Sequence, residues 1–348
     1  MKLLRPSLNW LLVFLPVAIV AEFSHLEVLA FVASALTIVP LAGLIGEATD
    51  QFAIRTGPRL GGLVNATFGN LTELVVGVFL ILNSDFEVVR ASLIGSIVGN
   101  LLLVLGASLL AGGLRRSELA FNREAAGVHS ASLLLAVVAL VTPALIIATR
   151  PVSATQAHGL SMGVAAILIV LYVSALLFTQ VTHSHLFGGP TPTEVPRWSM
   201  NRSLVVLVVS AVLVGYMSEI LVSSLRPALT VLPLSPLFVG LILVPVVGNA
   251  AEHASAIVFA LRNKVDLTLE IAIGSSAQVA LFIAPALVFV SLLVGHPMDF
   301  VFSGFEIAAV ALATLIVAVI ALDGRSNWLE GAQLLGVYLI IAVGALFA

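Results

Sequence analysis

The sequence predicts an all-α integral membrane protein, and its composition and the grouping of its apolar residues predict this class. Of the 348 residues, 60% are hydrophobic and only 9% are charged, whereas soluble domains carry about 25% charged residues. The mean hydropathy is +1.17. The apolar residues also fall into runs of roughly 20 residues, which is the length that a helix needs to cross a bilayer. A chain of this kind requires lipid as its solvent.

About eleven such runs follow one another, and each is predicted to be a transmembrane helix. The first run is too long for a signal-peptide core, so we interpret it as a retained helix. Several later runs contain proline, which a bundle tolerates because neighbouring helices satisfy the freed backbone groups. The predicted helices span residues 8–23, 27–46, 60–82, 88–112, 127–149, 158–179, 202–222, 235–261, 267–293, 301–322 and 329–347.

The charges of the connecting segments support this count and predict an orientation. With the N-terminus inside, only Arg90, Arg150 and Arg226 of the 15 Lys and Arg residues fall in outer segments. An excess of cations in cytoplasmic segments is the usual rule for membrane proteins. The pattern therefore predicts a cytoplasmic N-terminus and a C-terminus on the opposite side.

Two features of the composition exclude whole classes of function. The chain contains no cysteine, which rules out disulfides and thiolate metal sites. Its net charge of −3 is small and predicts no nucleic-acid partner. No resident cofactor is expected, and the composition leaves the oligomeric state open, homo-oligomers included.

An internal repeat is visible in the sequence. Gly-Asn-Leu-Thr-Glu at 69–73 recurs as Gly-Asn-Ala-Ala-Glu at 248–252, and each motif is followed by a Gly-Ser element, at 95–96 and 274–275. The offset from the first motif to its recurrence is the same as the offset between the two Gly-Ser elements. Two matched elements at one offset indicate a duplication.

The duplication predicts the organisation of the chain. Each unit contains five predicted helices, and because five is odd the second unit enters the membrane from the opposite side. Inverted repeats of this kind are common in secondary transporters, whose sites lie near the bilayer midplane. The predicted segments are an extra N-terminal helix at 1–25, a first repeat at 26–179, a polar linker at 180–201 and a second repeat at 202–348.

Each repeated motif places an acid inside an apolar run. A charged side chain at that depth costs roughly 2.5–3.5 kcal/mol, so Glu73 and Glu252 are candidate functional residues. The alternative, that both glutamates only hold helices together by hydrogen bonds, is disfavoured because they occur in duplicated motifs. Asn70 and Asn249 stand three residues before them, on the same helix face.

These residue types predict a site for a hard cation. Calcium takes 6–8 oxygen ligands from carboxylates, amides, carbonyls and waters. The glycine of each motif allows the helix to open and expose backbone carbonyls. Further polar residues lie on the following helices or beside the motifs. They are Ser96, Asn100, Ser275 and Gln278 as lining residues, Thr72 as an extra hydroxyl in the first half, and His253. His253 stands where the first repeat has Leu74, and it either tunes the site or is a hydrogen-bonded packing residue.

The remaining acids carry weaker predictions. Glu47 and Glu219 precede the two motifs near predicted helix ends, where a role in ion access competes evenly with a plain solvated position. An oxygen-rich site without sulfur suits calcium, manganese or sodium. A carboxylate in a low-dielectric site also favours its protonated form when no cation neutralises it. Competition between a cation and protons for Glu73 and Glu252 would give obligatory exchange.

The segments 62–73 and 95–106 resemble the first repeat of the calcium/proton antiporters, and 245–253 and 274–282 resemble their second repeat. This family belongs to the calcium/cation antiporter superfamily. The resemblance implies a core of five plus five helices with an extra first helix, and coordination of Ca²⁺ by Glu73 and Glu252. It also implies supporting roles for the asparagines, serines and glutamine named above. The short termini and plain linker resemble prokaryotic members and favour a plasma-membrane location.

Three alternatives remain at this level. Sodium/calcium or manganese/proton exchange by the same fold is not excluded by residue types, although sodium-coupled relatives typically have a proline before the glutamate and this chain has none. An intramembrane enzyme is disfavoured because the chain has no His-Glu-x-x-His motif and no cysteine. A passive channel is disfavoured because duplicated, inverted acidic sites favour alternating access.

Overall fold

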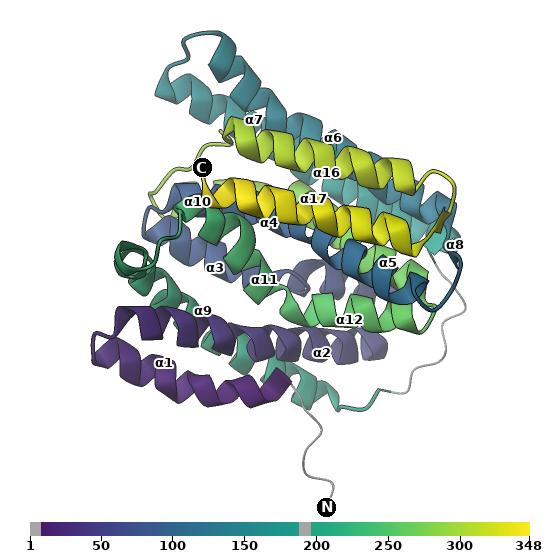
Figure 1. Cartoon of the computed structure of the whole chain (residues 1–348), viewed down its shortest axis with the longest axis horizontal. Helices are drawn as coiled ribbons and strands as arrows, with labels where there is room; N and C mark the ends of the chain where they lie inside the picture. Colours follow the sequence, from purple (N-terminus) through teal and green to yellow (C-terminus); the bar gives the residue numbers. More distant parts are fainter. Residues whose placement is uncertain (1–7, 188–195) are drawn as a thin grey trace, which may run out of the picture.

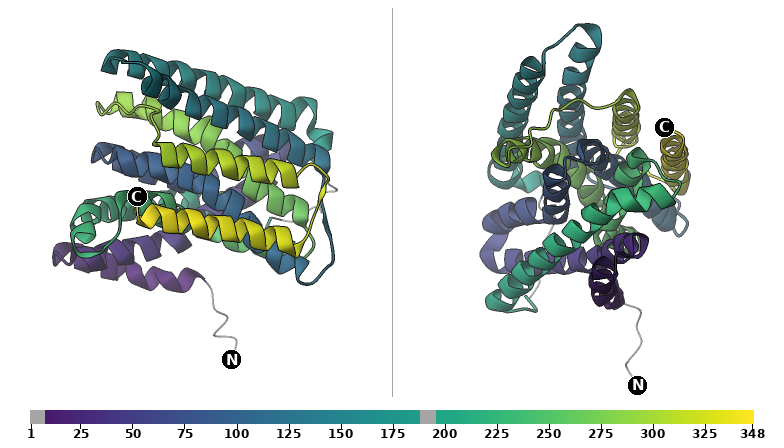
Figure 2. Two further views of the ribbon diagram at one scale, coloured as in Figure 1. Left: turned by 45° about the horizontal axis from the view of Figure 1, so that its top comes forward. Right: turned by 90° about the vertical axis from the view of Figure 1, so that its left-hand side faces the viewer.

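The computed structural model describes residues 8–187 and 196–348, with the side chains of 57–63, 65, 66, 185 and 187 left out. The described part is a bundle of helices (Figure 1), with α6, α7 and α16 along one side and α1 and α2 along the other. Two further views show the same arrangement (Figure 2). Among the described residues seven helices are long and apolar enough to cross a membrane, or eight if one bent pair counts as a span.

The bounds of the elements are as follows. The first half contains η1 (Leu8–Val13), α1 (Phe14–Phe23), α2 (Glu27–Phe68), α3 (Leu71–Leu82), α4 (Phe86–Val98), η2 (Gly99–Val104), α5 (Leu105–Gly113), β1 (Leu119–Ala120), α6 (Arg123–Thr149), α7 (Ala154–Leu177), η3 (Phe178–Thr182) and α8 (Ser184–Phe187). The second half contains α9 (Met200–Val231), α10 (Pro236–Phe238), η4 (Val239–Leu243), α11 (Val244–Gly248), α12 (Ala250–Leu261), α13 (Val265–Leu269), η5 (Glu270–Gly274), α14 (Ser275–Gln278), η6 (Val279–Ile283), α15 (Ala284–Leu293), α16 (Gly304–Ile320), β2 (Arg325–Ser326) and α17 (Trp328–Leu346).

The connecting segments gather at two ends of the bundle. At one end β1 pairs antiparallel with β2, and Arg116 donates to the Leu261 carbonyl at 3.3 Å. The backbone N–H of Asn122 donates to Asp266 at 2.6 Å. These contacts join three connections that the charge pattern assigns to the inner side. We call this end, with residues 114–122, 262–264 and 321–327, the basic end.

The connections assigned to the outer side meet at the other end, here called the opposite end (residues 83–85, 232–235 and 294–303). Arg226 donates to Asp85 at 2.6 Å, and Ser84 contacts His296 at 3.0 Å. Ser235 donates to the carbonyl of Ala345 at 2.7 Å. The two groups of connections that the sequence separates are therefore separated in space as well.

The repeated motifs occupy equivalent elements of opposite direction. α3 and α12 each have 12 residues, and each begins directly after the asparagine of its motif. α3 ends at Leu82, shortly before Asp85 of the opposite end, whereas α12 ends at Leu261, directly before Arg262 of the basic end. The elements around the two motifs are thus inverted relative to each other.

The structure differs from the predicted helices in two places. The predicted gap between 46 and 60 is wrong, because α2 is one helix to Phe68 and the break comes at 69–70 instead. The polar stretch that suggested a loop, 47–57, consists mostly of residues that a helix accommodates. In the predicted linker, η3 and α8 continue the helical structure to Phe187, and 188–195 lie outside the described residues. The count of eleven spans and the boundaries of the four predicted segments stay predictions.

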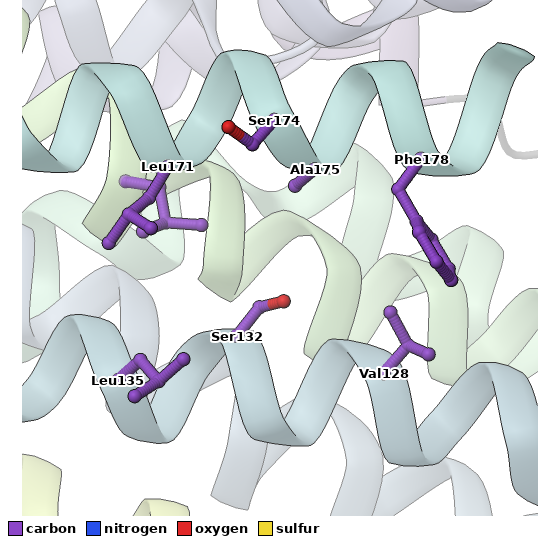
Figure 3. A pocket seen from close by; sticks show the side chains of 8 residues that line it. Val128, Ser132, Leu135, Leu171, Ser174, Ala175 and Phe178 are labelled. Atoms are coloured by element: carbon purple, nitrogen blue, oxygen red, sulfur yellow. The ribbon is translucent and has the colours of Figure 1, made fainter. Parts of the chain in front are cut away.

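The helices differ in how much of their surface the protein covers. The span Phe86–Gly113 is 83% buried within its most apolar window, whereas the spans of α6 and α7 are only 33% and 22% buried. A shallow groove separates α6 from α7 (Figure 3), and the side chains that line it are mostly apolar. α6 and α7 therefore present a lipid-facing surface, and the ion site has to be sought around the buried span.

Candidate functional site

The centre of the bundle is built from two helix breaks. Asn70 joins α2 to α3 and Asn249 joins α11 to α12, and both leave the helical conformation, with φ/ψ of −101°/26° and −105°/8°. At Asn249 the two helices meet at an angle of 63°. The sequence predicts openings at these motifs, and the structure confirms both.

Each break places a glutamate in the first turn of a helix. Glu73 lies in the first turn of α3 and Glu252 in the first turn of α12. The unpaired N–H groups of a helix N-terminus favour negative charge there. Two N-termini therefore point negative side chains into the same central region.

The two carboxylates lie close enough to interact electrostatically. Both residues are half-buried. Glu73 Oε1 is fully covered and has no hydrogen-bond partner among the described residues. A covered carboxylate oxygen without a partner is costly, so this position calls for a cation, a proton or water.

Polar side chains from both halves gather near Glu252. The Ser275 hydroxyl lies 3.5 Å from Glu252 Oε2 and 3.2 Å from Asn70 Oδ1, and it can donate to either oxygen. Asn70 Nδ2 in turn donates to Gln278 Oε1 at 2.8 Å. Four predicted site residues from both repeats are thus brought together.

The arrangement around Glu73 is the counterpart of this one. Asn249 is within hydrogen-bonding reach of Glu73. Its Nδ2 donates to the Pro245 carbonyl at 3.2 Å and to Ser96 Oγ at 3.5 Å. Each asparagine therefore contacts the serine that belongs to the other repeat.

Three further predicted residues lie near this centre, and among the described residues no hydrogen bond is seen from their side chains to either glutamate; Asn100 and Thr72 are buried and His253 is half-buried. Asn100 is completely buried in η2, and neither atom of its amide has a partner in the described part of the chain. His253 Nε2 is likewise covered and lacks a partner there. Thr72 is buried and faces the backbone at Gly248. Their assigned roles stay predictions.

The sequence places Glu47 and Glu219 near predicted helix ends, and this prediction is wrong. Both are exposed and sit well inside α2 and α9. Glu219 is close to Glu22 and Tyr216, on the side where α1 packs. The neighbours of Glu219 are thus Glu22 and Tyr216, and its role in ion access stays a prediction.

Asp50 is a residue of the site region that the sequence did not reveal. It is exposed on α2, yet it lies close enough to Glu252 to interact with its charge. In the sequence Asp50 falls between the predicted helices 27–46 and 60–82, in a polar stretch of the kind that is usually solvated. Only the packing of α2 against the motif helices places it near the centre.

The composition of the site limits the ions that it suits. Among the described residues no three His, Cys, Asp or Glu side chains gather as a metal centre. The site offers two carboxylates, with amide and hydroxyl oxygens around them. Such oxygen ligands suit a hard cation. A site with only two carboxylates can also release that cation again, as transport requires.

Comparison with known proteins identifies relatives of this chain. The profile of the family described as "Sodium/calcium exchanger protein" matches residues 26–181 and 202–347. The chain is 42% identical to the Ca²⁺/H⁺ antiporter of Aphanothece halophytica, over 97% of this chain and 95% of that protein. It is 40% identical to the Ca²⁺/H⁺ antiporter ChaA of Bacillus subtilis, over 94% and 95%.

Solved structures agree with these relatives. Native YfkE superposes with a TM-score of 0.86 at 37% identity, covering 98% of this chain and 99% of that one. The H⁺/Ca²⁺ exchanger CAX gives a TM-score of 0.76 over 98% of this chain and 91% of that one. At 14% identity this second likeness concerns the fold alone.

Proposed function

The chain belongs to the sodium/calcium exchanger protein family, and on this basis we propose that it exchanges Ca²⁺ for H⁺ across a membrane by alternating access. Glu73 and Glu252 bind either the Ca²⁺ ion or protons. The protein is a multi-pass membrane transporter and not an enzyme. The observation that carries the proposal is the meeting of two carboxylates at two inverted helix breaks.

The geometry provides what each half of the exchange needs. Two carboxylates neutralise the double charge of Ca²⁺, and the oxygens of Asn70 and Ser275 stand beside them. When the ion leaves, two like charges in a low-dielectric site repel each other, which favours uptake of protons. One site that holds either Ca²⁺ or protons, but not both, couples the two fluxes.

We also propose the setting in which the exchange occurs. The basic end faces the cytoplasm, because cations are enriched in cytoplasmic segments. Its bacterial relatives support a location in the plasma membrane of a prokaryote. In that orientation an inward proton gradient drives Ca²⁺ out of the cell.

Transport by the purified protein tests this proposal. The protein is reconstituted into sodium-free vesicles, a pH gradient is imposed, and uptake of labelled Ca²⁺ against its gradient is measured. We expect uptake that a protonophore abolishes. Glu73→Gln and Glu252→Gln should each lower uptake by at least about 100-fold, because one of the two charges that neutralise Ca²⁺ is lost.

Glu118→Gln is the matched control. It makes the same chemical change at the basic end, where Glu118 is half-exposed and paired with Arg325. Its uptake should equal that of the unmodified protein. Uptake that requires sodium would assign the chain to sodium/calcium exchange, and full activity of either central variant would refute the shared site.

A further inference from the structure

The two halves of the bundle are packed unequally around the site. On α4, Val88 and Ala91 are buried and lie directly against Gly240 of η4. One turn further along, Gly95 packs against the backbone carbonyl of Leu241 with no room for a side chain. The first repeat is therefore tightly packed on the side of the opposite end.

The equivalent face of the second repeat, here called the open face, is more exposed. Leu267 and Glu270 are the counterparts of Val88 and Ala91 at the offset of the repeat, but the relative exposure of Leu267 is 42% against 3% for Val88. Gly274 is the counterpart of Gly95, and the nearest neighbour of a Cβ there would be the side-chain carboxylate of Glu270 rather than a backbone carbonyl. The second repeat is therefore less covered near the basic end than the first repeat is near the opposite end.

A titratable pair occupies this open face. Glu270 Oε2 lies 2.9 Å from Nε2 of His129 on α6, and 53% of the Glu270 side chain is exposed. The carboxylate folds back toward Gly274, one residue before Ser275 of the central site. The first repeat has no such pair, because alanine stands at both equivalent positions, 91 and 308.

The other ionisable groups near Glu270 come from the elements that pack against η5. The elements packed against η5 are α6, α12, α13, α14 and η2, and η2 and α14 contain no ionisable residue. Asp266 of α13 accepts a hydrogen bond from Asn122. Besides His129, α6 contributes Arg123 and Glu124 at its first turn, and α12 contributes Glu252, His253 and, at its end, Arg262.

We propose that Glu270 and His129 form a proton-dependent gate that controls closure of the path to the basic end. In the alternate state of an inverted-repeat transporter, the second repeat takes the packing that the first repeat has here. Glu270 would then occupy an environment like that of Ala91, which is fully buried. An uncompensated carboxylate is not tolerated there, whereas a carboxylate paired with a protonated imidazole is.

The gate follows from the charge of the pair. With His129 protonated, the pair is neutral overall and the path closes. With His129 neutral, the charge of Glu270 keeps the path open toward the basic end. The inference rests on the proposed exchange function, since it makes one step of alternating access depend on the pH at the basic end.

Thiol labelling tests the gate without requiring transport. The chain has no cysteine, so a single introduced thiol reports on its own position. Leu267→Cys reports opening at the basic end, and Val88→Cys reports opening at the opposite end. In reconstituted protein the labelling rate of Leu267→Cys should rise as the pH at the basic end rises, while that of Val88→Cys falls.

Variants of the pair then separate the outcomes. Added to the reporter, Glu270→Ala should make labelling of Leu267→Cys lower and largely independent of pH. His129→Ala should raise it at low pH by at least about tenfold, because Glu270 is left unpaired. The double variant Glu270→Ala/His129→Ala should behave as Glu270→Ala does.

Three results would overturn the gate. They are a pH dependence that survives Glu270→Ala, a double variant that resembles His129→Ala, and parallel rather than opposed changes at the two reporters. Parallel increases would indicate loosened packing instead of a shifted equilibrium. Failure of the exchange function is distinguishable, because it is measured separately, as Ca²⁺ uptake by the unmodified protein that is absent or that requires sodium.

Discussion

A single methyl group at Gly95 should shift the protein out of the state seen here. An alanine Cβ at this position would overlap the carbonyl oxygen of Leu241 and lie 2.7 Å from Cγ of Pro245. The backbone of η4 cannot move aside as a flexible side chain can. Overpacking of this kind costs about 1–3 kcal/mol, and it costs this only while the two elements are in contact.

Gly274→Ala provides the matched comparison, because it adds the same methyl group to the equivalent glycine of the second repeat. In this state the nearest neighbour of that methyl group would be the side-chain carboxylate of Glu270, at 3.1 Å. Its cost should fall on the alternate state, in which the second repeat is closed. The two substitutions should therefore move the equilibrium in opposite directions, each by roughly 5- to 150-fold.

The reporters Val88→Cys and Leu267→Cys measure this shift. Gly95→Ala should raise the labelling rate of Val88→Cys and lower that of Leu267→Cys, and Gly274→Ala should do the reverse. Both should slow Ca²⁺ uptake, since each disfavours one of two states that every cycle visits. If both substitutions changed the reporters in the same direction, the equivalence of the two contacts would be refuted.

Three further predictions concern stability, protons and ion access. Arg226→Ala should destabilise the protein by about 1–3 kcal/mol, because it leaves the buried carboxylate of Asp85 unpaired. Arg325→Ala, which breaks an exposed pair, should change stability by at most about 1 kcal/mol, and thermal unfolding in detergent compares the two. Lowering the pH on the side that supplies Ca²⁺ should raise the KM for Ca²⁺, because protons compete for the same carboxylates. The rise should be up to about tenfold per pH unit for each competing proton. A KM that is independent of pH would contradict shared binding. Asp50→Asn should raise the KM for Ca²⁺ by at most about two- to fivefold, because the Asp50 carboxylate acts on Glu252 through its charge. The difference in KM should shrink in high salt, which screens that interaction.

The central site could be predicted from the sequence because its signal is local and duplicated. Asn70 and Glu73 belong to one motif, and the offset to Asn249 and Glu252 identifies their partners without any knowledge of packing. The structure adds that each asparagine reaches across to the other repeat. The two separated groups of loops could also be predicted, because charge segregation across a bilayer leaves its trace in composition.

The residues that the sequence could not place depend on contacts between distant elements. Asp50 looks like a boundary residue until α2 is packed against the motif helices. Glu270 looks like one too, and its pairing with His129 joins positions in different repeats for which no motif provides a signal. The sequence predicts the break after α2 at 46–60, because a run of polar residues indicates a loop more often than it indicates a continuous helix.

Exact symmetry between the repeats would give the two access states the same packing, and hence the same energy in a symmetric environment. The differences between the repeats must therefore set the bias between the states. Gln278 binds Asn70, while its counterpart Gly99 has no side chain to bind Asn249. Glu270 stands on the open face, while Ala91 lies in the closed contact. The shared residues build a site that both states use, and the unequal ones make the basic end the side where charge, and through it pH, controls closure.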